Sequence, residues 1–319
     1  MRRVVLTGGA GFIGSHVLDT LVRRGVEVVV VDDLSSGRRA NIESHLVSER
    51  CRFVEMDVAH TGFRDLVADT RPDAVIHLAA QSTVVGSVAD PHIDARTNIL
   101  GTLNVALAVI GAKVPKLVCA ASGGTLYDDY RTPAESGSTP LAGEPPSPYG
   151  LSKRVAVEYL ALLERLYGLS WTALALGNAF GPRQRPDTGA GVVSIFAEAL
   201  LGGLPVTVFG DGSSTRDYVY VADVADAFVH AVDHGQGLYN IGSGVSRSVL
   251  DVLKAVAEAV GLDDPPVLWA PARPSEVEQV LLDSAAFTAL GWRPVFSFED
   301  GVRAVADFEA DRRSRAHAV

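Results

Sequence analysis

Cysteine is rare in this sequence of 319 residues, and no pattern of metal ligands is present. Cys51 and Cys119 are the only two cysteines, and each lies in an apolar segment typical of a β-strand. Such surroundings favour two buried thiols over a disulfide. Histidine, cysteine and acidic side chains nowhere have the spacing of metal ligands, so we expect no metal site.

Positive charge is also scarce. Lysine and arginine total 28 against 38 acidic residues, which gives a net charge of −10. An acidic chain is not drawn non-specifically to nucleic acid or to an anionic membrane. There is no uninterrupted apolar run of about 18 residues and no signal peptide before the first predicted strand. We therefore expect a cytoplasmic protein with no nucleic-acid and no membrane partner, in which a few arginines hold any anionic ligand.

Two periodicities alternate over residues 1–176. Short β-branched segments such as "RVVLT", "EVVVV" and "DAVIHLA" are separated by helical patterns such as "FIGSHVLDTLVRRG". This alternation predicts an α/β fold: a Rossmann-type doubly wound parallel sheet with helices on both faces. Ligands of such sheets bind beyond the carboxyl ends of the strands.

The pattern loosens after residue 176. A regular helix and a strand at about 217–241 are expected to return to the main sheet. We expect residues 177–216 and 242–319 to form a smaller, interleaved α/β lobe that binds the substrate. Residues 1–176 would be the cofactor-binding domain.

A glycine-rich loop opens the first predicted helix. Gly8, Gly11 and Gly14 have the spacing G-x-x-G-x-x-G in "TGGAGFIG". Glycines there let the backbone approach a pyrophosphate, and a helix N-terminus offers it N–H groups. Asp32 ends the second predicted strand, where its carboxylate can bind a ribose and would repel a 2′-phosphate. The predicted cofactor is therefore NAD rather than NADP, although the arginines of "SGRRAN" could pair with that phosphate.

A tyrosine precedes a lysine by four residues in "PPSPYGLSKRVAVEYL". Ser147 and Pro148 resemble a helix N-cap and first helical residue, so Tyr149 and Lys153 would lie on one face of the first turns. A tyrosine with the ordinary pKa of about 10 needs a drop of roughly 3 units, worth about 4 kcal/mol, to act as a base near neutrality. A cation about 4 Å away supplies about 4 kcal/mol at an effective dielectric constant of about 20. We therefore predict that Lys153 lowers the pKa of Tyr149.

With the glycine loop and the Tyr149–Lys153 pair, the chain resembles the extended short-chain dehydrogenase/reductase family over nearly its whole length. The stretches "HLAAQSTV", "GNAFGPRQRPD", "VTVFGDGSSTRDYVYVADVADA" and "RPSEVEQVLLD" are similar to those of nucleotide-sugar 4-epimerases. The resemblance implies NAD as cofactor, a UDP-sugar substrate and a homodimer. It implies that Tyr149 takes the proton of the sugar 4-hydroxyl while hydride passes to NAD. The resulting 4-ketose turns over, and hydride returns to its other face.

The resemblance also implies the contacts of the cofactor and the substrate. Cofactor contacts are expected at Gly8, Gly11, Phe12, Ile13, Gly14, Asp32, Asp57, Val58, Leu78, Ala79, Ala80, Gln81, Asn98, Tyr149 and Lys153. Substrate contacts are expected at Ser82, Asn178, Arg185, Val192, Val193, Phe209, Arg216, Arg273 and Glu276. Guanidinium groups suit phosphate oxygens, and a helix that begins at Val192 could offer N–H groups to a phosphate. Phe209 could border the nucleobase or belong to the core.

A hydroxyl that contacts the sugar 4-oxygen is expected in "CAASGGTLYDDY", where Ser122 and Thr125 are both candidates. Dehydratases of this family carry an Asp-Glu pair in this segment and decarboxylases usually an acid, whereas Gly124 and Thr125 stand here. Asp128 replaces a usual glycine. We therefore expect 4-epimerisation. The alternatives are a nucleotide-sugar reductase, dehydratase or decarboxylase, or a non-catalytic NAD-sensing module. The sugar remains open among glucose/galactose, the N-acetylated pair and the uronates.

Overall fold

The computed structural model describes residues 1–126, 145, 147–188, 191–272 and 278–317 of the chain. A seven-stranded sheet forms the larger part of the molecule, and all of its neighbouring strands pair in parallel. Its strands, in spatial order, are β10 (Gly237–Ile241), β6 (Trp171–Leu176), β5 (Leu117–Ser122), β4 (Ala74–His77), β1 (Arg3–Thr7), β2 (Glu27–Asp32) and β3 (Cys51–Glu55). The order reverses between β1 and β4, which is the switch point of a doubly wound fold. The predicted fold class is confirmed.

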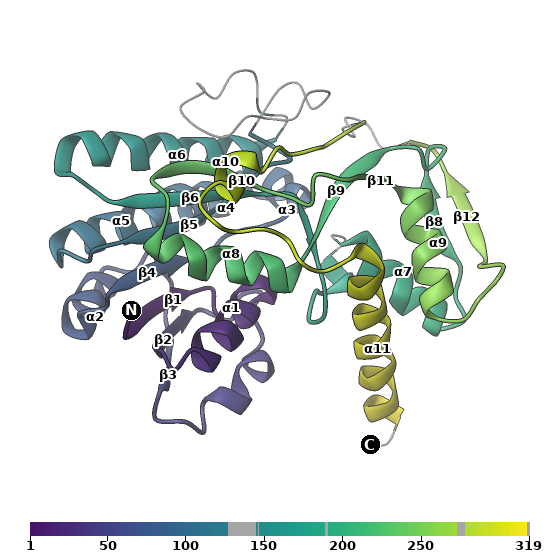
Figure 1. Ribbon diagram of the computed structural model, residues 1–319, viewed down its shortest axis with the longest axis horizontal. Coiled ribbons are helices and arrows are strands. Elements are labelled where there is room, and N and C mark those ends of the chain that lie inside the picture. Colours follow the sequence, from purple (N-terminus) through teal and green to yellow (C-terminus); the bar gives the residue numbers. More distant parts are fainter. Residues whose placement is uncertain (127–144, 146, 189–190, 273–277, 318–319) are drawn as a thin grey trace.

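Helices cover both faces of this sheet (Figure 1). One face packs against α1 (Phe12–Arg23) and α8 (Val221–Asp233), and the other against α2 (Gly62–Thr70), α5 (Thr102–Gly111) and α6 (Pro148–Tyr167). Successive residues of a strand point to opposite faces, so Val4 and Leu6 join the first core and Val5 joins the second. Cys51 and Cys119 are buried, free thiols in these two different cores, as predicted.

A helical stretch beside α6 is unusually apolar. It runs through α3 (Val84–Ala89), α4 (Pro91–Asp94), the π-helical turn η3 (Ala95–Gly101) and α5. By length and composition alone, the segment Pro91–Gly111 could cross a membrane. In the 18-residue window of this segment that meets the criterion, 44% is buried inside the fold. The segment packs on α2 and α6, as the apolar core helix of a globular protein also does.

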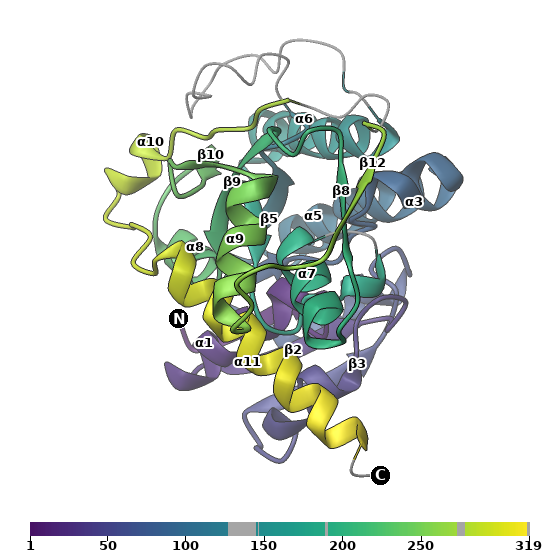
Figure 2. The same cartoon turned by 90° about the vertical axis from the view of Figure 1, so that its right-hand side faces the viewer.

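The rest of the chain forms a smaller lobe around a third core (Figures 1 and 2). It contains a three-stranded sheet, β11 (Ser246–Ser248), β9 (Thr215–Tyr220) and β7 (Asn178–Phe180), and the strand pair β12 (Val267–Ala270) and β8 (Val206–Phe209). Its helices are α7 (Val192–Leu201), α9 (Val249–Ala259) and α11 (Phe298–His317). Short turns complete the described fold: η1 (Arg39–Asn41), η2 (Glu43–His45), η4 (Pro186–Thr188) and α10 (Ala285–Thr288).

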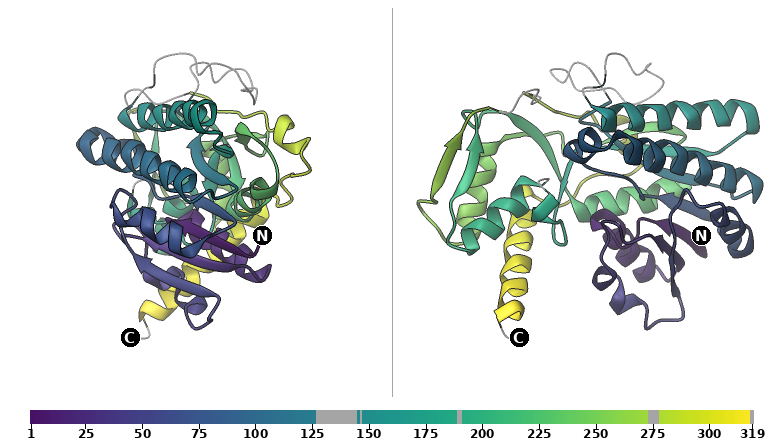
Figure 3. Two further views of the ribbon diagram at one scale, coloured as in Figure 1. Left: turned by 90° about the vertical axis from the view of Figure 1, so that its left-hand side faces the viewer. Right: turned by 180° about the vertical axis from the view of Figure 1, so that it is seen from behind.

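The chain passes between the two parts more than once. β7 leads into the lobe, α8 and β10 return to the seven-stranded sheet, and β11 lies in the lobe again. Seen from behind, the lobe and the sheet lie side by side, and α11 extends downward from the lobe to the C-terminus (Figure 3). The carboxyl ends of the central strands thus face loops that lead into the lobe.

His77 joins the sheet to α5. Its Nδ1 lies 2.7 Å from Thr7 Oγ1 and its Nε2 lies 3.1 Å from Thr102 Oγ1. Burial, and secondarily the charge of Lys153, lower the pKa of His77 to about 3. The ring is therefore neutral and satisfied, as expected of a structural histidine at a strand end.

The buried His77 predicts a pH dependence of stability. Its folded pKa of about 3 lies below the ordinary 6.5, so the unfolded chain binds the proton first as the pH falls. The stability contributed by the neutral His77 ring is complete above the ordinary pKa of 6.5 and is lost as the pH falls towards the folded pKa of about 3. We expect His77 to lower the free energy of unfolding by about 2 kcal/mol between about pH 7 and about pH 5.

Urea unfolding of wild type and His77→Gln at the two pH values measures this effect. Glutamine retains hydrogen-bonding groups but does not titrate. The free energy of unfolding of His77→Gln should therefore fall by about 2 kcal/mol less than that of wild type between the two pH values. Equal declines in the two proteins would contradict the assignment.

Candidate active site

The glycine loop packs too closely for side chains. Gly8 has φ +68°, and a Cβ there would lie 2.5 Å from the backbone nitrogen of Ala79. A Cβ on Gly14 would lie 2.0 Å from the carbonyl oxygen of Gly8. Gly11 is the N-cap of α1 and has no side chain to accept from the first turn of the helix. The N–H groups of that turn therefore face the carboxyl edge of the sheet, which suits a pyrophosphate.

Asp32 is held at the end of β2 with 6% of its surface exposed. Its carboxylate accepts hydrogen bonds from the backbone N–H groups of Ala10 and Leu34, both at 2.9 Å. Burial, partly offset by these two bonds, raises the pKa of Asp32. The neighbouring Arg38 lies 3.8 Å from Asp187, and Arg39 stacks over the ring of Phe53 at 5.2 Å. Both arginines thus have other partners than a cofactor phosphate.

A cavity of about 320 Å³ extends along the carboxyl edge of the sheet. Most of the residues predicted from the sequence line it: Gly8, Gly11, Phe12, Ile13, Gly14, Asp32, Asp57, Val58, Leu78, Ala79, Ala80, Ser82, Ser122, Tyr149, Lys153 and Arg185. The glycines, carboxylates and small polar groups of this lining suit a dinucleotide. The structure therefore brings the predicted cofactor loop and the predicted tyrosine and lysine to one site.

Asn98 and Gln81 lie behind this lining. Asn98 Nδ2 is 2.9 Å from Asp94 Oδ1, 3.1 Å from Ser152 Oγ and 3.0 Å from the carbonyl oxygen of Gln81. Asn98 Oδ1 also accepts from the N–H of Gln81 at 3.0 Å. Asn98, which stays a predicted cofactor contact, fixes the loop after β4 against α6 through these bonds. The π-helical turn η3 presents Asn98 to this loop, in keeping with the frequent occurrence of such turns at functional sites.

The start of α6 orients the predicted base. The side chain of Ser147 caps the helix by accepting from the N–H of Gly150 at 3.2 Å, and Pro148 is the first helical residue. The side chain of Tyr149 hydrogen-bonds to that of Ser122, at the end of β5. Thr125 Oγ1 is buried without a hydrogen-bond partner among the described residues, and Thr125 is not part of the cavity lining. Of the two candidate hydroxyls, the structure brings Ser122 to the tyrosine.

Burial, rather than Lys153, dominates the pKa of Tyr149, and the direction predicted from the sequence is wrong. Burial raises the pKa of Tyr149 to about 12, while the hydrogen bond with Ser122 opposes the rise and Asp94 adds to it. Lys153 Nζ lies 5.9 Å from the centre of the Tyr149 ring and donates to the carbonyl oxygen of Ala120 at 3.3 Å. Burial also lowers the pKa of Lys153, to about 8. The enclosed site therefore favours the neutral form of both side chains.

Apart from Arg185, the described residues of the lobe that are predicted to contact the substrate do not line the cavity. Arg216, on β9, donates to the carbonyl oxygen of Thr215 at 2.8 Å. Asn178, Val192, Val193 and Phe209 begin β7, begin α7 or end β8, and none of these residues lines the cavity. Val193 is fully buried. Arg273, Glu276 and Asp128 lie outside the described residues.

Packing explains the glycine beside Ser122. A Cβ on Gly123 would lie 2.5 Å from Leu282 Cδ1 and 3.0 Å from the carbonyl oxygen of Leu176. Leu282 itself is 1% exposed. The lobe thus fills the space that a side chain at position 123 would need, so this turn carries Ser122 without an adjacent acid. Gly124 is less constrained, with Val280 at 3.9 Å.

Sequence reasoning missed part of the lining. Asn41, Met56, Thr97, Arg183 and Gln184 also face the cavity. Arg183 lies in the stretch "GNAFGPRQRPD". On an acidic protein, an arginine is a candidate contact for an anionic ligand. Arg183 could have been predicted from the sequence on this ground.

The comparisons with known proteins agree with this geometry. The model of the NAD dependent epimerase/dehydratase family matches residues 4–242. The UDP-glucose 4-epimerase of Mycolicibacterium smegmatis is 41% identical over 309 residues, which are 96% of this chain and 98% of that protein. The structure of the Thermus thermophilus UDP-glucose 4-epimerase in complex with NAD has a TM-score of 0.88 and 42% identity, over 96% of this chain and 98% of that one.

A second solved structure, the Thermotoga maritima UDP-glucose 4-epimerase with UDP-glucose, has a TM-score of 0.88 and 38% identity. The match covers 98% of this chain and 99% of the Thermotoga maritima chain. The family expected from the sequence and its cofactor, NAD, are therefore confirmed. The chain belongs to the NAD-dependent epimerase/dehydratase family.

Proposed function

We propose that this protein is a cytoplasmic, homodimeric UDP-sugar 4-epimerase that works through a transient 4-keto sugar. The observation that carries the proposal is the pairing of Tyr149 with Ser122 in the cavity, beside Lys153 and without an acid at positions 123–125. The relatives named UDP-glucose 4-epimerase support the same reaction.

The side chains of the cavity suit proton transfer at the sugar 4-oxygen. Tyr149 accepts the proton of the 4-hydroxyl in the first half of the reaction and returns it in the second, while Ser122 holds the oxygen by a hydrogen bond. Bound NAD would supply the acceptor and donor of the hydride at C4, and its oxidised ring would bring positive charge. Added positive charge lowers a tyrosine pKa, which offsets the rise that burial causes in Tyr149.

The competing reactions need groups that this turn lacks. Dehydration requires an acid and a base beside C5 and C6, and residues 123–125 supply two glycines and a threonine. A non-catalytic NAD-sensing module does not need a tyrosine and a lysine in the cavity, and both are present. Epimerisation requires only the tyrosine and a hydroxyl, which favours it over these alternatives.

The environment of Arg185 favours a neutral hexose. Its Nε and Nη2 bind the carboxylate of Asp187 at 2.9 and 2.6 Å, and its Nη1 donates to the carbonyl oxygen of Ser36 at 3.2 Å. A bidentate partner already neutralises the charge that a uronate carboxylate would need. We therefore favour UDP-glucose and UDP-galactose over UDP-glucuronate as substrates.

A panel of UDP-sugars tests the reaction and the substrate together. UDP-glucose should give a 4-epimer of unchanged mass, identified by NMR, and UDP-glucuronate should react at least about tenfold more slowly, as the loss of one charge-assisted contact implies. A 4-keto-6-deoxy sugar or a UDP-pentose as main product would contradict the proposed reaction. Faster turnover of UDP-glucuronate would contradict only the argument from Arg185.

Replacing the proposed base tests the mechanism. Tyr149→Phe should lose at least about 10²-fold in turnover, the low end for a missing acid–base group, and still bind NAD and UDP. Turnover is measured by separating the epimers, and binding by calorimetry. Tyr167→Phe, on an exposed position at the end of the same helix, is the matched control and should be unaffected. Near-normal turnover of Tyr149→Phe would remove this residue from the mechanism.

An exposed apolar face supports a second copy of the chain as partner. Leu151, Tyr159, Leu162 and Leu166 are exposed on α6, and their spacing puts them on one side of the helix. Exposed valines, isoleucine and leucine on the neighbouring α3, α4 and η3 extend this face: Val84, Val85, Val88, Ile93 and Leu100. Contiguous apolar surface of this kind marks an interface, so a dimer that covers it would explain the composition of these helices.

The dimer is tested by charge insertion. Leu166→Asp, at a position 60% exposed, should convert the protein to a monomer, measured by light scattering, because it buries a charge in the interface. Leu204→Asp is the control, since Leu204 is 61% exposed but precedes β8 in the lobe. A dimeric Leu166→Asp variant would exclude this face as the interface.

A further inference from the structure

Residues 182–187, here called the strap, follow β7 and connect the lobe to the cofactor side of the molecule. Arg183, Gln184 and Arg185 of the strap line the cavity. Residues of the glycine loop, Ser35, Ser36 and Asn41 line it as well. Contacts between the strap and these segments therefore join separate parts of the cavity lining.

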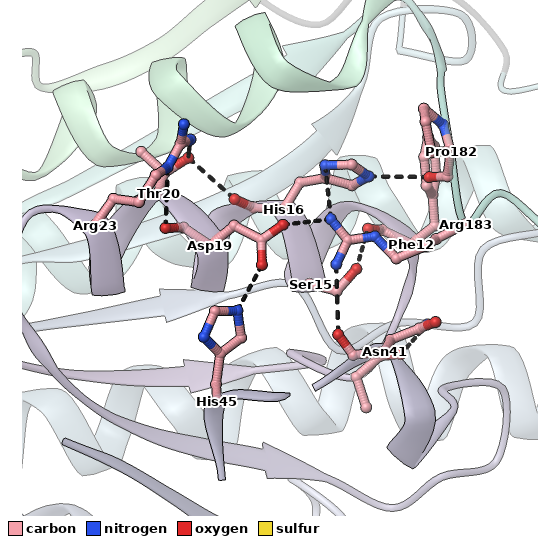
Figure 4. A network of polar contacts seen from close by, with 11 residues as sticks. Phe12, Ser15, His16, Asp19, Thr20, Arg23, Asn41, His45, Pro182 and Arg183 are labelled. Atoms are coloured by element: carbon pink, nitrogen blue, oxygen red, sulfur yellow. Dashed lines mark hydrogen bonds and ion pairs between the residues drawn. The ribbon is translucent and has the colours of Figure 1, made fainter. Parts of the chain in front are cut away.

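Arg183 makes the most enclosed of these contacts (Figure 4). Its Nη2 pairs with the carboxylate of Asp19 and lies 2.9 Å from His16 Nδ1, both on α1. Its Nη1 lies 3.4 Å from the carbonyl oxygen of Asn41. The side chain is 17% exposed, and the backbone of Arg183 has φ +69°, a left-handed conformation that is unusual for arginine. The surroundings thus hold this residue in one arrangement.

The helix α1 is built to receive this guanidinium. His16 Nε2 lies 2.9 Å from the carbonyl oxygen of Pro182, so Nε2 carries the hydrogen and Nδ1 is left to accept from Arg183. Burial, then the charge of Arg183, lower the pKa of His16 to about 4, which keeps this tautomer neutral. The second oxygen of Asp19 binds His45 Nε2 at 2.6 Å. Asp19 is thereby fixed from two sides.

A weaker fastening lies nearer to solvent. Arg185 donates to the carbonyl oxygen of Ser36, and Asp187 lies 3.8 Å from Arg38. The side chains of Arg38 and Asp187 are 51% and 54% exposed, so their pair contributes little. The enclosed contact of Arg183 is the stronger of the two fastenings.

Residues 38–41, which the strap contacts, are themselves tied to the cofactor loop. The side-chain amide of Asn41 and the backbone N–H of Arg38 both donate to the carbonyl oxygen of Ala10, at 2.8 and 3.0 Å. A continuous ring of contacts therefore runs from the glycine loop through residues 38–41 to the strap and back to α1 at Asp19. Asn41 and Arg183, two members of this ring, also line the cavity that fits the dinucleotide.

We propose that the strap retains bound NAD, and that Arg183 is the positioning residue that fastens it through Asp19. The proposal rests on the cofactor of the family and not on the identity of the sugar. Release of NAD then requires the contact between Arg183 and Asp19 to open. Retention suits a reaction in which the same cofactor molecule is reduced and reoxidised within each turnover.

Asp19 makes the test specific because it does not line the cavity. The holoenzyme is loaded with labelled NAD, and its exchange with unlabelled NAD is followed for wild type, Asp19→Asn, Arg183→Gln and the double variant. Each single variant should release NAD on the order of tenfold faster or more, as expected for loss of a charge-assisted contact. The double variant should be no faster than Arg183→Gln alone, because both changes remove one interaction.

Arg38→Gln, which removes the exposed pair with Asp187 of the strap, is the matched control and should change the release rate less than about fivefold. Unfolding by urea with saturating NAD shows that each variant is folded, and Arg183→Lys with Asp19→Asn carries the test if Arg183→Gln does not fold. Release from Asp19→Asn at the wild-type rate would overturn the proposal. So would equal acceleration by Arg38→Gln, or loss of stability without faster release.

Discussion

The close approach of backbone at the glycine loop is the constraint on which the site depends. The strand order reverses between β1 and β4, and the loop after β1 fills the opening, with Gly8 against Ala79 and Gly14 against Gly8. Because side chains cannot fit there, the first turn of α1 stays uncovered towards the cavity. Ala10, at the centre of this loop, then organises both of its sides, since its N–H binds Asp32 and its carbonyl oxygen binds Asn41.

Enclosure determines the electrostatics of the cavity as much as its charges do. The walls that exclude water raise the pKa of Tyr149 to about 12 and lower that of Lys153 to about 8. A phenolate is therefore unfavourable until more positive charge enters the cavity. The enclosed site therefore keeps Tyr149 protonated near neutral pH, and the base role proposed for it depends on the positive charge that an oxidised cofactor would add.

The sequence predicted what depends on neighbours along the chain. The alternation of strands and helices, the glycine spacing before α1, and the cap of Ser147 and Pro148 before Tyr149 are all local, and the structure has each of them. The contacts that local patterns could not reveal join distant segments. Arg183 and Asp19 are 164 residues apart, and Asn98 and Ser152 are 54 apart. The pKa of Tyr149 was predicted in the wrong direction for the same reason, because burial is a property of the whole fold.

Two carboxylates relate the lobe to the cofactor side. Asp19 receives the strap, and Asp217, on β9, accepts from the backbone N–H groups of Ser243, Gly244 and Leu282. Leu282 in turn packs against Gly123, next to Ser122. The strap thus fixes the lobe near the cofactor loop, and Asp217 fixes it near the predicted reacting hydroxyl. Since hydride transfer depends on a short, defined approach of two reactants, a lobe anchored at both points meets a requirement that neither anchor meets alone.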